Sequence, residues 1–493
     1  MLWVAGTAQA AVTQVEPPAK WAAYYEAVRK ADTIADDEAR CRAYPDLPGM
    51  QWAQGVGSGR CSILREPVLT LEQIEAILAQ PEGLAELDRR YAALLEGHYK
   101  DPAQREQIHM AFNSFDHGER AQAVAGRWVK AAPGSAFAQA AAGRQRLSMA
   151  TEARGENIIR DTPQQNLDRM HEHLLAATPY FSESLRIEPR LSPSCVGLAQ
   201  VMRLGAGHEY WSSVVAQCVA RDPDSYLTVL EWCEGATPKW GGSMEELRVM
   251  VAYATAGVAR NPALGSFAGE LAYAAFRNAD DPDAPALAAI AATGPSASIM
   301  ARTGYALASS RDHWGAFAHH SQAIRYRPAN ALYRYNRALL LRRFGDYDWA
   351  LRDLHIASAL EPQDLDYVYG IGLVLRDVEG DAAALPHFKR ALATTDPVLK
   401  RQSTEMYCQA LLSTDTLSEA DTCTRDMVAA YPELGEAWRL RSEVLIEQDD
   451  DGRQLRPAAE NFLRYANPDF RHHAAAVPRM RGILRMLDAE QPK

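Results

Sequence analysis

Long apolar runs and an excess of basic residues are both missing from this sequence of 493 residues. No stretch of 18 or more apolar residues occurs, which excludes a conventional membrane-spanning helix. The formal net charge is −11 and the calculated pI is about 5.7. Such an acidic balance argues against a broad surface for nucleic acids or anionic membranes. The apolar fraction of 47% is ordinary for a folded protein, so we expect a packed chain. From the charge, we expect a partner that is neither nucleic acid nor bilayer.

The sequence also lacks the short motifs of several enzyme classes. It has no HExxH pair, no GxSxG elbow and no CxxC spacing. The glycines at residues 55–59 suggest a phosphate loop, but the Lys-Ser/Thr that should follow them is missing, so we interpret a flexible turn. The acidic run at residues 447–452 is similar to a calcium loop, but Ala458 stands where the closing glutamate belongs. We therefore predict no metal site, no cofactor and no catalytic residue.

Cysteine is scarce, with seven in the chain. Cys41 and Cys61 flank a loop rich in glycine and proline, and Cys408 and Cys423 lie at places 8 and 23 of one repeat of a pattern described below. Places 8 and 23 face each other across a helix pair, so Cys408 and Cys423 could form a disulfide. Cys41 and Cys61 are the other candidate pair. A bond that closes the loop between Cys408 and Cys423 contributes about 3 kcal/mol in the chain-entropy model.

Three further cysteines, Cys195, Cys218 and Cys233, form a group of which two could pair. The amino terminus bears on the same question, because Ala-Gln-Ala at residues 8–10 matches a signal-cleavage pattern. A basic start and a long apolar run are missing, so we interpret residues 1–16 as a truncated signal peptide with a linker. Together these features favour a periplasmic or exported protein. The alternative is a cytoplasmic protein with a frayed terminus and free buried cysteines.

One pattern recurs every 34 residues between residues 297 and 434. Small residues fall at equivalent places, and a proline falls near the end of most periods: Gly304, Ala316, Ala323 and Pro328; Ala338, Ala350, Ala357 and Pro362; Gly372, Ala384, Phe388 and Ala391; Ala420 and Pro432. Small residues let two helices cross closely, and proline ends the second helix. The pattern resembles the tetratricopeptide repeat family. That resemblance implies an all-α superhelical solenoid of antiparallel helix pairs that holds a protein or peptide partner.

The rest of the chain divides around these repeats. We expect a smaller amino-terminal segment of helices and loops at 17–118, a degenerate helical-repeat region at 119–296, regular repeats at 297–469, and a capping helix with a tail at 470–493. In the first segment, Thr70 and Gln73 form a candidate capping box for a helix that runs towards Tyr99.

A Trp-Gly-Gly-Ser turn precedes an apolar helix in the degenerate region. It comprises Trp240, Gly241, Gly242 and Ser243, and Ser243 with Glu246 matches a capping box. Together with the Ala-Pro-Gly-Ser stretch that begins at residue 132, this turn resembles the bacterial domain of unknown function 4034 family over residues 119–260. The resemblance implies a bacterial origin and no assigned activity. We interpret the turn as a helix start, with a ligand-contacting loop as the alternative.

Tyrosine and arginine gather at the places that line the concave groove in tetratricopeptide proteins. The candidate partner-binding residues are Arg302, Tyr305, Tyr335, Asn336, Arg342, Arg343, Tyr369 and Arg376. Because Tyr335 and Tyr369 share one place and Arg342 and Arg376 share another, stacked repeats would align a tyrosine row beside an arginine row. Such residues dominate binding hot spots. We predict a non-enzymatic scaffold; the alternative is that the tyrosines pack between helices and the arginines are merely solvated.

Other functions stay open. The lysine and asparagine clamp that holds a terminal carboxylate in some tetratricopeptide proteins is not expected, since Tyr305 replaces an asparagine and the lysines are missing, although Asn336 matches. An anionic or aromatic segment, or a folded acidic partner, would suit the groove. A second hypothesis, by analogy between folds, is an immunity or chaperone-like partner of a secreted bacterial effector. A third is a hydrolase with its site near Ser243.

Overall fold

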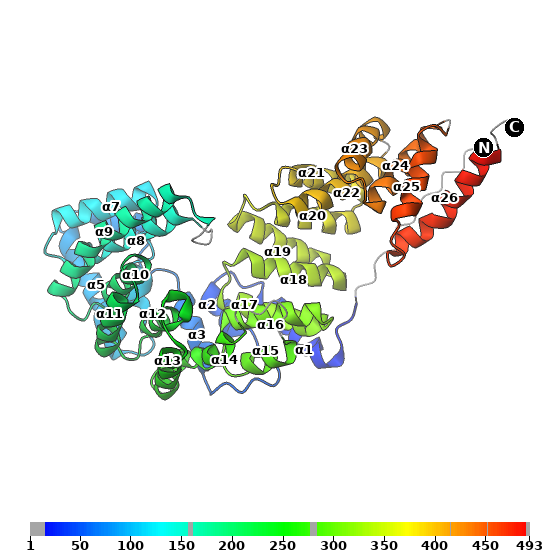
Figure 1. The fold of residues 1–493 in the computed structure, drawn as a ribbon. Helices are drawn as coiled ribbons and strands as arrows, with labels where there is room; N and C mark the ends of the chain where they lie inside the picture. The colour runs from blue at the N-terminus through cyan, green and yellow to red at the C-terminus, as the bar shows by residue number, and fades with distance from the viewer. Residues whose placement is uncertain (1–14, 156–160, 277–282, 415, 451, 490–493) are drawn as a thin grey trace. The chain divides into compact units, whose positions relative to one another are not determined.

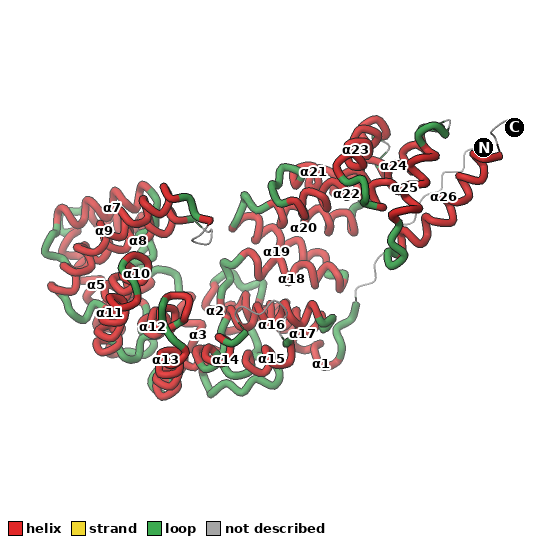
Figure 2. The backbone as a smooth tube through the Cα atoms, viewed as in Figure 1, coloured by secondary structure: helices red, strands yellow, loops and turns green. Residues whose placement is uncertain are grey.

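The computed structural model describes residues 15–155, 161–276, 283–414, 416–450 and 452–489 (Figure 1). Every regular element among these residues is a helix, and none of them forms a strand (Figure 2). The predicted all-α fold is therefore confirmed. The candidate signal peptide falls on residues 1–14, outside the described residues. In the described ranges, no helix is both long enough and apolar enough to cross a membrane.

The chain divides into two compact units. The amino-terminal unit spans Pro17–Pro328 and contains α1 (Ala19–Ala31), α2 (Asp37–Ala43), α3 (Val56–Cys61), α4 (Leu71–Leu78), α5 (Gly83–Lys100), α6 (Gln107–Ala111), α7 (Glu119–Ala131), α8 (Ala136–Arg154), α9 (Gln164–Ile187), α10 (Ser192–Gly205), α11 (His208–Arg221), α12 (Tyr226–Ala236), α13 (Met244–Gly257), α14 (Glu270–Ala274), α15 (Ala284–Ala291), α16 (Ala297–Ser309) and α17 (His313–Tyr326). Short 3₁₀ segments also join them, among them η1 (Ser62–Leu64), η3 (Pro238–Trp240) and η4 (Pro262–Phe267).

The carboxy-terminal unit runs from Ala329 onward and takes in the short described stretch before Pro17. Its helices are α18 (Ala331–Phe344), α19 (Tyr347–Leu360), α20 (Leu365–Val378), α21 (Asp381–Ala391), α22 (Pro397–Ser413), α23 (Leu417–Ala430), α24 (Gly435–Glu447), α25 (Leu455–Tyr465) and α26 (Arg471–Ala489). The first eight form four consecutive helix pairs, and α26 packs on α24 and α25 through Phe462, Met480 and Ile483. The 34-residue period is visible in the starts of α16, α18 and α20 at residues 297, 331 and 365.

Aromatic packing against glycine fixes three helices of the amino-terminal unit. Gly143 of α8 and Gly197 of α10 both face the ring of Phe181 on α9. A Cβ atom would lie 2.8 Å from the ring at Gly143 and 2.4 Å from it at Gly197, so the ring or a helix would have to shift. The two missing side chains therefore let α8, α9 and α10 approach around one buried ring. This junction forms one wall of the cavity described below.

The first two helices of the chain pack on α17, the second helix of the first regular repeat. Tyr24 donates its hydroxyl hydrogen to the carbonyl of Ala318 at 3.1 Å, and Gln322 donates to the Tyr24 oxygen at 2.9 Å. Arg325 donates to the carbonyl of Cys41 at 2.8 Å and pairs with Asp46. Residues 17–46 and the first repeat thus share one hydrogen-bonded core.

Three disulfides lie within the units. They join Cys41 of α2 to Cys61 of α3, Cys195 of α10 to Cys218 of α11, and Cys408 of α22 to Cys423 of α23. The Cα atoms of each pair are 5.5–5.6 Å apart, which is the usual spacing. Cys233 is buried and takes no part in these bonds. The third group of cysteines therefore pairs through its first two members.

A buried ion cluster joins α18 to α19. Both oxygens of Asp353 accept from Arg337 at 2.7 and 2.9 Å, and one also accepts from Arg334 at 3.0 Å. The side chains of Arg337 and Asp353 are 0% and 1% exposed. The guanidinium of Arg337 also lies 5.0 Å from the ring of Trp349. This pairing closes the first helix pair of the carboxy-terminal unit.

Candidate functional site

The two predicted tyrosines of the carboxy-terminal unit are half-buried between helices. Tyr335 of α18 packs on Tyr367 with ring centroids 5.4 Å apart, and Tyr369 of α20 packs on Phe388 at 5.7 Å. Burial raises the pKa of both hydroxyls, so each remains a hydrogen-bond donor at neutral pH. Part of each ring is therefore structural, as the alternative interpretation expected, and the remainder is accessible.

An acidic residue, Asp377, lies beside the predicted arginine row, and the repeat pattern did not indicate it. Arg342 of α18 donates to Asp377 of α20 at 2.6 Å, and Nε of Arg376 lies 3.8 Å from the same carboxylate. Side chains in the first pair are 26% and 22% exposed. Arg343 is exposed and forms no ion pair with a described residue. The row is therefore a mixed strip in which Asp377 neutralises part of the positive charge.

The remaining candidates of this group occupy α16 and α18. Arg302 and Tyr305 lie on α16 of the amino-terminal unit, where Tyr305 is 53% exposed and the Arg302 guanidinium is 5.9 Å from its ring. Asn336 lies on α18, half-buried beside Tyr335 in sequence. Tyr305 is thus an exposed aromatic ring with a cation beside it, which is a common arrangement at binding surfaces.

The Trp-Gly-Gly-Ser turn is a helix start. Gly241 has a φ of +87°, and a Cβ on Gly242 would lie 2.3 Å from the carbonyl oxygen of Ala236, so both positions require glycine. Ser243 accepts from the amide of Glu246 at 3.1 Å, while Glu246 accepts from the amide of Ser243 at 2.9 Å. The predicted capping box is present.

The surroundings of Ser243 offer little to a hydrolase. Its hydroxyl lies 3.4 Å from the Glu246 carboxylate, and the other oxygen of Glu246 lies 2.9 Å from Nε2 of His208. A serine nucleophile needs the imidazole beside the hydroxyl, whereas here the carboxylate stands between the two. The indole of Trp240 lies 4.8 Å from the Arg203 guanidinium, which holds the turn against α10.

A buried polar cluster joins α5, α6 and α10 to the start of α12, and nothing in the sequence pointed to it. His98 of α5 lies 2.7 Å from Asp222, 124 residues further along the chain. Its other ring nitrogen accepts the amide hydrogen of Glu106 at 3.0 Å, so the nitrogen that faces Asp222 carries a hydrogen. Burial lowers the pKa of His98, but the hydrogen bond and charge of Asp222 outweigh it, so the pKa is raised.

Glu106 and His109 complete this cluster. Glu106 accepts from the amide of Tyr226 at 2.6 Å and from the hydroxyl of Ser225 at 3.0 Å, which caps α12. Burial nevertheless raises its pKa to about 7. His109 lies 3.0 Å from the hydroxyl of Ser192, and burial lowers its pKa to about 3, so the ring is neutral. A base with so low a pKa would accept a proton poorly.

Two groups of side chains have the donor atoms of a metal site. His98, His109 and Asp222 bring theirs within 4.8 Å of one another, as do Glu436, His472 and His473. In the first group the hydrogen on His98 already faces the carboxylate. In the second, Glu436 is held by Arg439 through two hydrogen bonds, and His473 accepts the amide hydrogen of Asn467. Both groups are satisfied as hydrogen-bond networks that dock helices.

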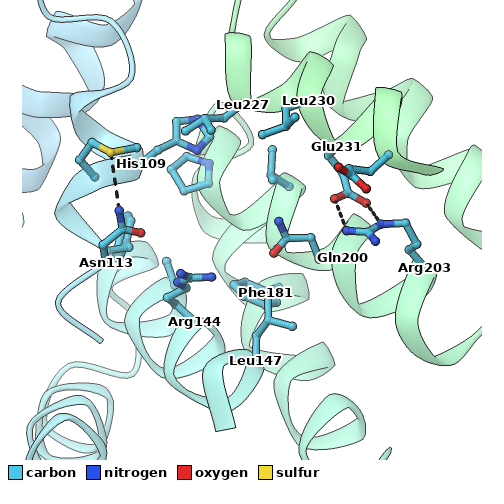
Figure 3. Close-up of a pocket in the computed structure, with 17 residues that line it drawn as sticks. His109, Asn113, Arg144, Leu147, Phe181, Gln200, Arg203, Leu227, Leu230 and Glu231 are labelled. Carbon is cyan, nitrogen blue, oxygen red and sulfur yellow. Dashed lines mark hydrogen bonds and ion pairs between the residues drawn. The ribbon is translucent and has the colours of Figure 1, made fainter. Parts of the chain in front are cut away.

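The Arg144 pocket is a cavity of about 250 Å³ beside His109 (Figure 3). Five helices and the loop after α6 build it: α6, α8, α9, α10 and α12. Its apolar walls are formed by Leu147, Phe181, Val196, Leu227 and Leu230, and its polar lining by His109, Asn113, Arg144, Gln200, Arg203, Glu231 and Glu234. On one side Glu231 accepts from Arg203 at 2.8 and 2.9 Å and from Trp211 at 3.0 Å, so its charge is balanced.

No protein-family model matches the chain, and no curated protein matches its sequence. The resemblance of residues 119–260 to the domain of unknown function 4034 family is thus not supported by a family model. Among solved structures, the chain is similar to YrrB, described as a tetratricopeptide protein with an unusual peptide-binding site. The identity is 18% over 39% of this chain and 98% of that chain, with a TM-score of 0.32.

Two further solved structures are similar at comparable levels. MamA from Desulfovibrio magneticus RS-1 shares 18% identity over 34% of this chain and 92% of its own, with a TM-score of 0.30. The APC/C hetero-tetramer Cut9–Hcn1 shares 13% identity over 93% of this chain and 83% of its own, with a TM-score of 0.40. Because these scores are low, the fold assignment rests on the helix pairs of this chain.

Proposed function

We propose that the chain is a non-enzymatic scaffold that holds a protein or peptide partner on the first helices of its repeats. The observation that carries the proposal is the matched pair of tyrosine and arginine on α18 and α20. Tyr335 and Tyr369 are 34 residues apart, as are Arg342 and Arg376, and all four are partly accessible. A row of such side chains offers apolar area and directed donors in a regular array.

The charge of this surface favours a partner segment with acidic and aromatic residues. Asp377 accepts a hydrogen bond from Arg342, while Arg343 is exposed. The surface therefore offers hydrogen-bond donors without a large positive electrostatic field. A carboxylate on the partner would gain charge-assisted hydrogen bonds from the exposed arginine. An aromatic side chain would pack on the accessible tyrosine edges.

Site-specific photo-crosslinking tests this assignment. A benzoylphenylalanine placed at the exposed position Arg343 should cross-link a partner in the native host. The same group at His355, exposed on the second helix α19, should not. Replacing Arg342 and Arg376 by alanine should abolish the Arg343 cross-link. The protein should stay folded, because a half-exposed ion pair contributes about 1 kcal/mol or less.

Arg352, exposed on α19, is the matched control, and its alanine variant should cross-link as the wild type does. An identical partner captured from position 355, or a cross-link that survives the double alanine variant, would contradict the proposal.

A finer version of the proposal is an exported bacterial protein that neutralises or chaperones a secreted effector. The three disulfides support an oxidising compartment, where such bonds persist. Mass spectrometry of the protein from its native host tests the compartment, since an intact Met1 with free thiols would contradict export.

A gene for an effector next to the gene for this protein would support the neutralising role. Labelling of Ser243 by a serine-hydrolase probe would favour an enzyme instead.

A further inference from the structure

The Arg144 pocket lies in the amino-terminal unit, away from the residues of the proposed scaffold surface in sequence and in element. Arg144 belongs to α8, and its guanidinium forms no hydrogen bond or ion pair with any residue that the structure describes. Figure 3 shows the side chain between Asn113 and Phe181, at the edge of the cavity. The side chain is half-buried, and this burial lowers the pKa of the guanidinium, as expected for a charge partly removed from water without a counter-charge.

Two other arginines with buried or half-buried side chains in this unit have acidic partners, whereas buried Arg60 lies against the rings of Tyr226 and Tyr326. Arg203 is paired with Glu231 on the opposite side of the same pocket, and Arg325 is paired with Asp46. Since burying a charge without a partner costs free energy, an isolated guanidinium that faces a cavity is a position where a ligand can supply the missing anion.

Two carboxamides add further donors beside Arg144. Asn113 donates to the sulfur of Met110 at 3.6 Å, which is a weak acceptor, and Gln200 forms no hydrogen bond within the described residues. Neither side chain is therefore committed to a strong partner. A planar guanidinium with two amide groups matches the two oxygens of a carboxylate, which arginine binds through parallel hydrogen bonds.

The remaining charges of the pocket limit the ligand to a single negative charge. Arg203 is already neutralised by Glu231, and Glu234 on α12 contributes a further carboxylate to the lining. His109 is neutral because burial lowers its pKa to about 3. Arg144 is therefore the cation of the lining that no carboxylate of a described residue contacts, and a dianion such as phosphate would bring a second negative charge next to Glu234.

The apolar walls determine the rest of the ligand. Phe181 is held in place by the two glycines that face it, and Leu147, Leu227 and Leu230 line the same space. The volume of about 250 Å³ exceeds the roughly 150 Å³ of an engineered cavity that holds benzene. The space therefore suits a benzene-sized group with a short chain.

We propose that the Arg144 pocket binds a monocarboxylate with an apolar body, the carboxylate on Arg144 and the body against Phe181 and Leu230. Two sources share this chemistry: a free carboxylic acid, and the carboxyl terminus of a peptide with an apolar last residue. Both present one anion next to an apolar group of the right size.

Calorimetry on the full chain tests this site with four probes. They are 3-phenylpropanoate, its neutral amide, an acetylated Ala-Ala-Phe peptide with a free carboxyl terminus, and the same peptide amidated. We expect at least one carboxylate to bind about tenfold or more tightly than its amide. Binding of the free acid alone identifies a small metabolite, and binding of the peptide alone identifies a chain terminus. Equal affinity of acid and amide, or no binding of either acid up to about 10 mM, would overturn the proposal.

Variants assign the binding to this pocket. Arg144→Met should weaken the carboxylate by about tenfold or more without lowering the melting temperature, because the guanidinium has no internal partner to lose. Arg146→Met, two residues along the same helix and outside the lining, should bind as the wild type does. Should Arg144→Met fail to fold, Leu227→Trp fills the cavity and should block the probe with Arg144 intact. Undiminished binding in the folded variants would refute the site.

Discussion

The buried ion cluster of α18 and α19 provides the sharpest test of how the repeat surface is held in shape. Asp353 is the acceptor for both Arg334 and Arg337, and its side chain is 1% exposed. Replacing it by asparagine keeps the shape and removes the negative charge that accepts from both buried guanidiniums. Removing one partner of such a pair costs about 3–5 kcal/mol. We expect Asp353→Asn to destabilise this helix pair by at least the lower figure, about 3 kcal/mol.

The assay has to be local, because stacked repeats open in parts and a single unfolding midpoint would average over them. Hydrogen exchange with mass spectrometry on peptides from α18 and α19 resolves the pair. A loss of about 3 kcal/mol corresponds to exchange faster by roughly a hundredfold where exchange follows the open population. Peptides from α24 and α25 should change far less.

Asp348, exposed on α19, is the matched control, and Asp348→Asn should leave exchange within about threefold of the wild type. Acceleration of less than about tenfold in Asp353→Asn would refute the reasoning. Apolar contacts alone would then hold α18 against α19, and the alignment of Tyr335 and Arg342 would not depend on the cluster.

Three further predictions follow from other parts of the chain. Replacing Cys408 and Cys423 by serine should destabilise α22 and α23 by about 3 kcal/mol, measured by hydrogen exchange on those helices, because the bond closes a loop of 15 residues. Gly197→Ala should lower the free energy of unfolding by about 1–3 kcal/mol in urea titrations, since its Cβ would lie 2.4 Å from Phe181. His109, with a folded pKa of about 3 against 6.5, stays unprotonated in the folded state between those values while the unfolded chain binds a proton. Stability from this residue is therefore lost as the pH falls below 6.5, by about 2–3 kcal/mol at pH 4.5, and His109→Gln should lack that loss.

Each of these has its own control. Wild-type protein treated with reductant should match the serine variant in α22 and α23, and a difference between them would point to strain from the serines. Gly126→Ala on α7, where a Cβ meets open space, should not destabilise the protein, which distinguishes crowding from the general effect of alanine. The pH dependence of stability is compared between wild type and the His109 variant. The raised pKa of Glu106 changes stability in the opposite direction to the lowered pKa of His109, but it is present in both proteins, so its contribution cancels in the comparison. Parallel pH curves for the two proteins would show that the imidazole is accessible to protons.

The sequence determined the helical architecture and its period. The recurrence of small residues and prolines every 34 residues is a local signal, because helix crossing and helix termination depend on residues within one or two turns. The starts of α16, α18 and α20 follow it. Capping boxes at Thr70 and Ser243 were visible for the same reason, since cap and partner are three residues apart.

Only the tertiary structure decided which charged side chains are already paired. Arg342 and Arg343 are adjacent in sequence, but Asp377 from the next repeat holds the first and leaves the second exposed. His98 meets Asp222 across 124 residues.

The sequence also did not indicate that the Arg144 guanidinium has no ion-pair partner among the described residues, although it gives every residue of the helix that carries Arg144. Whether a charge is buried, and what faces it, depends on how five helices from distant parts of the chain pack together. The periodicity of apolar residues identifies which face of a helix is buried. It does not identify which side chains from other helices pack against that face. Local hydrogen bonding therefore made the scaffold predictable, while long-range packing determined its pocket and its charge pairs.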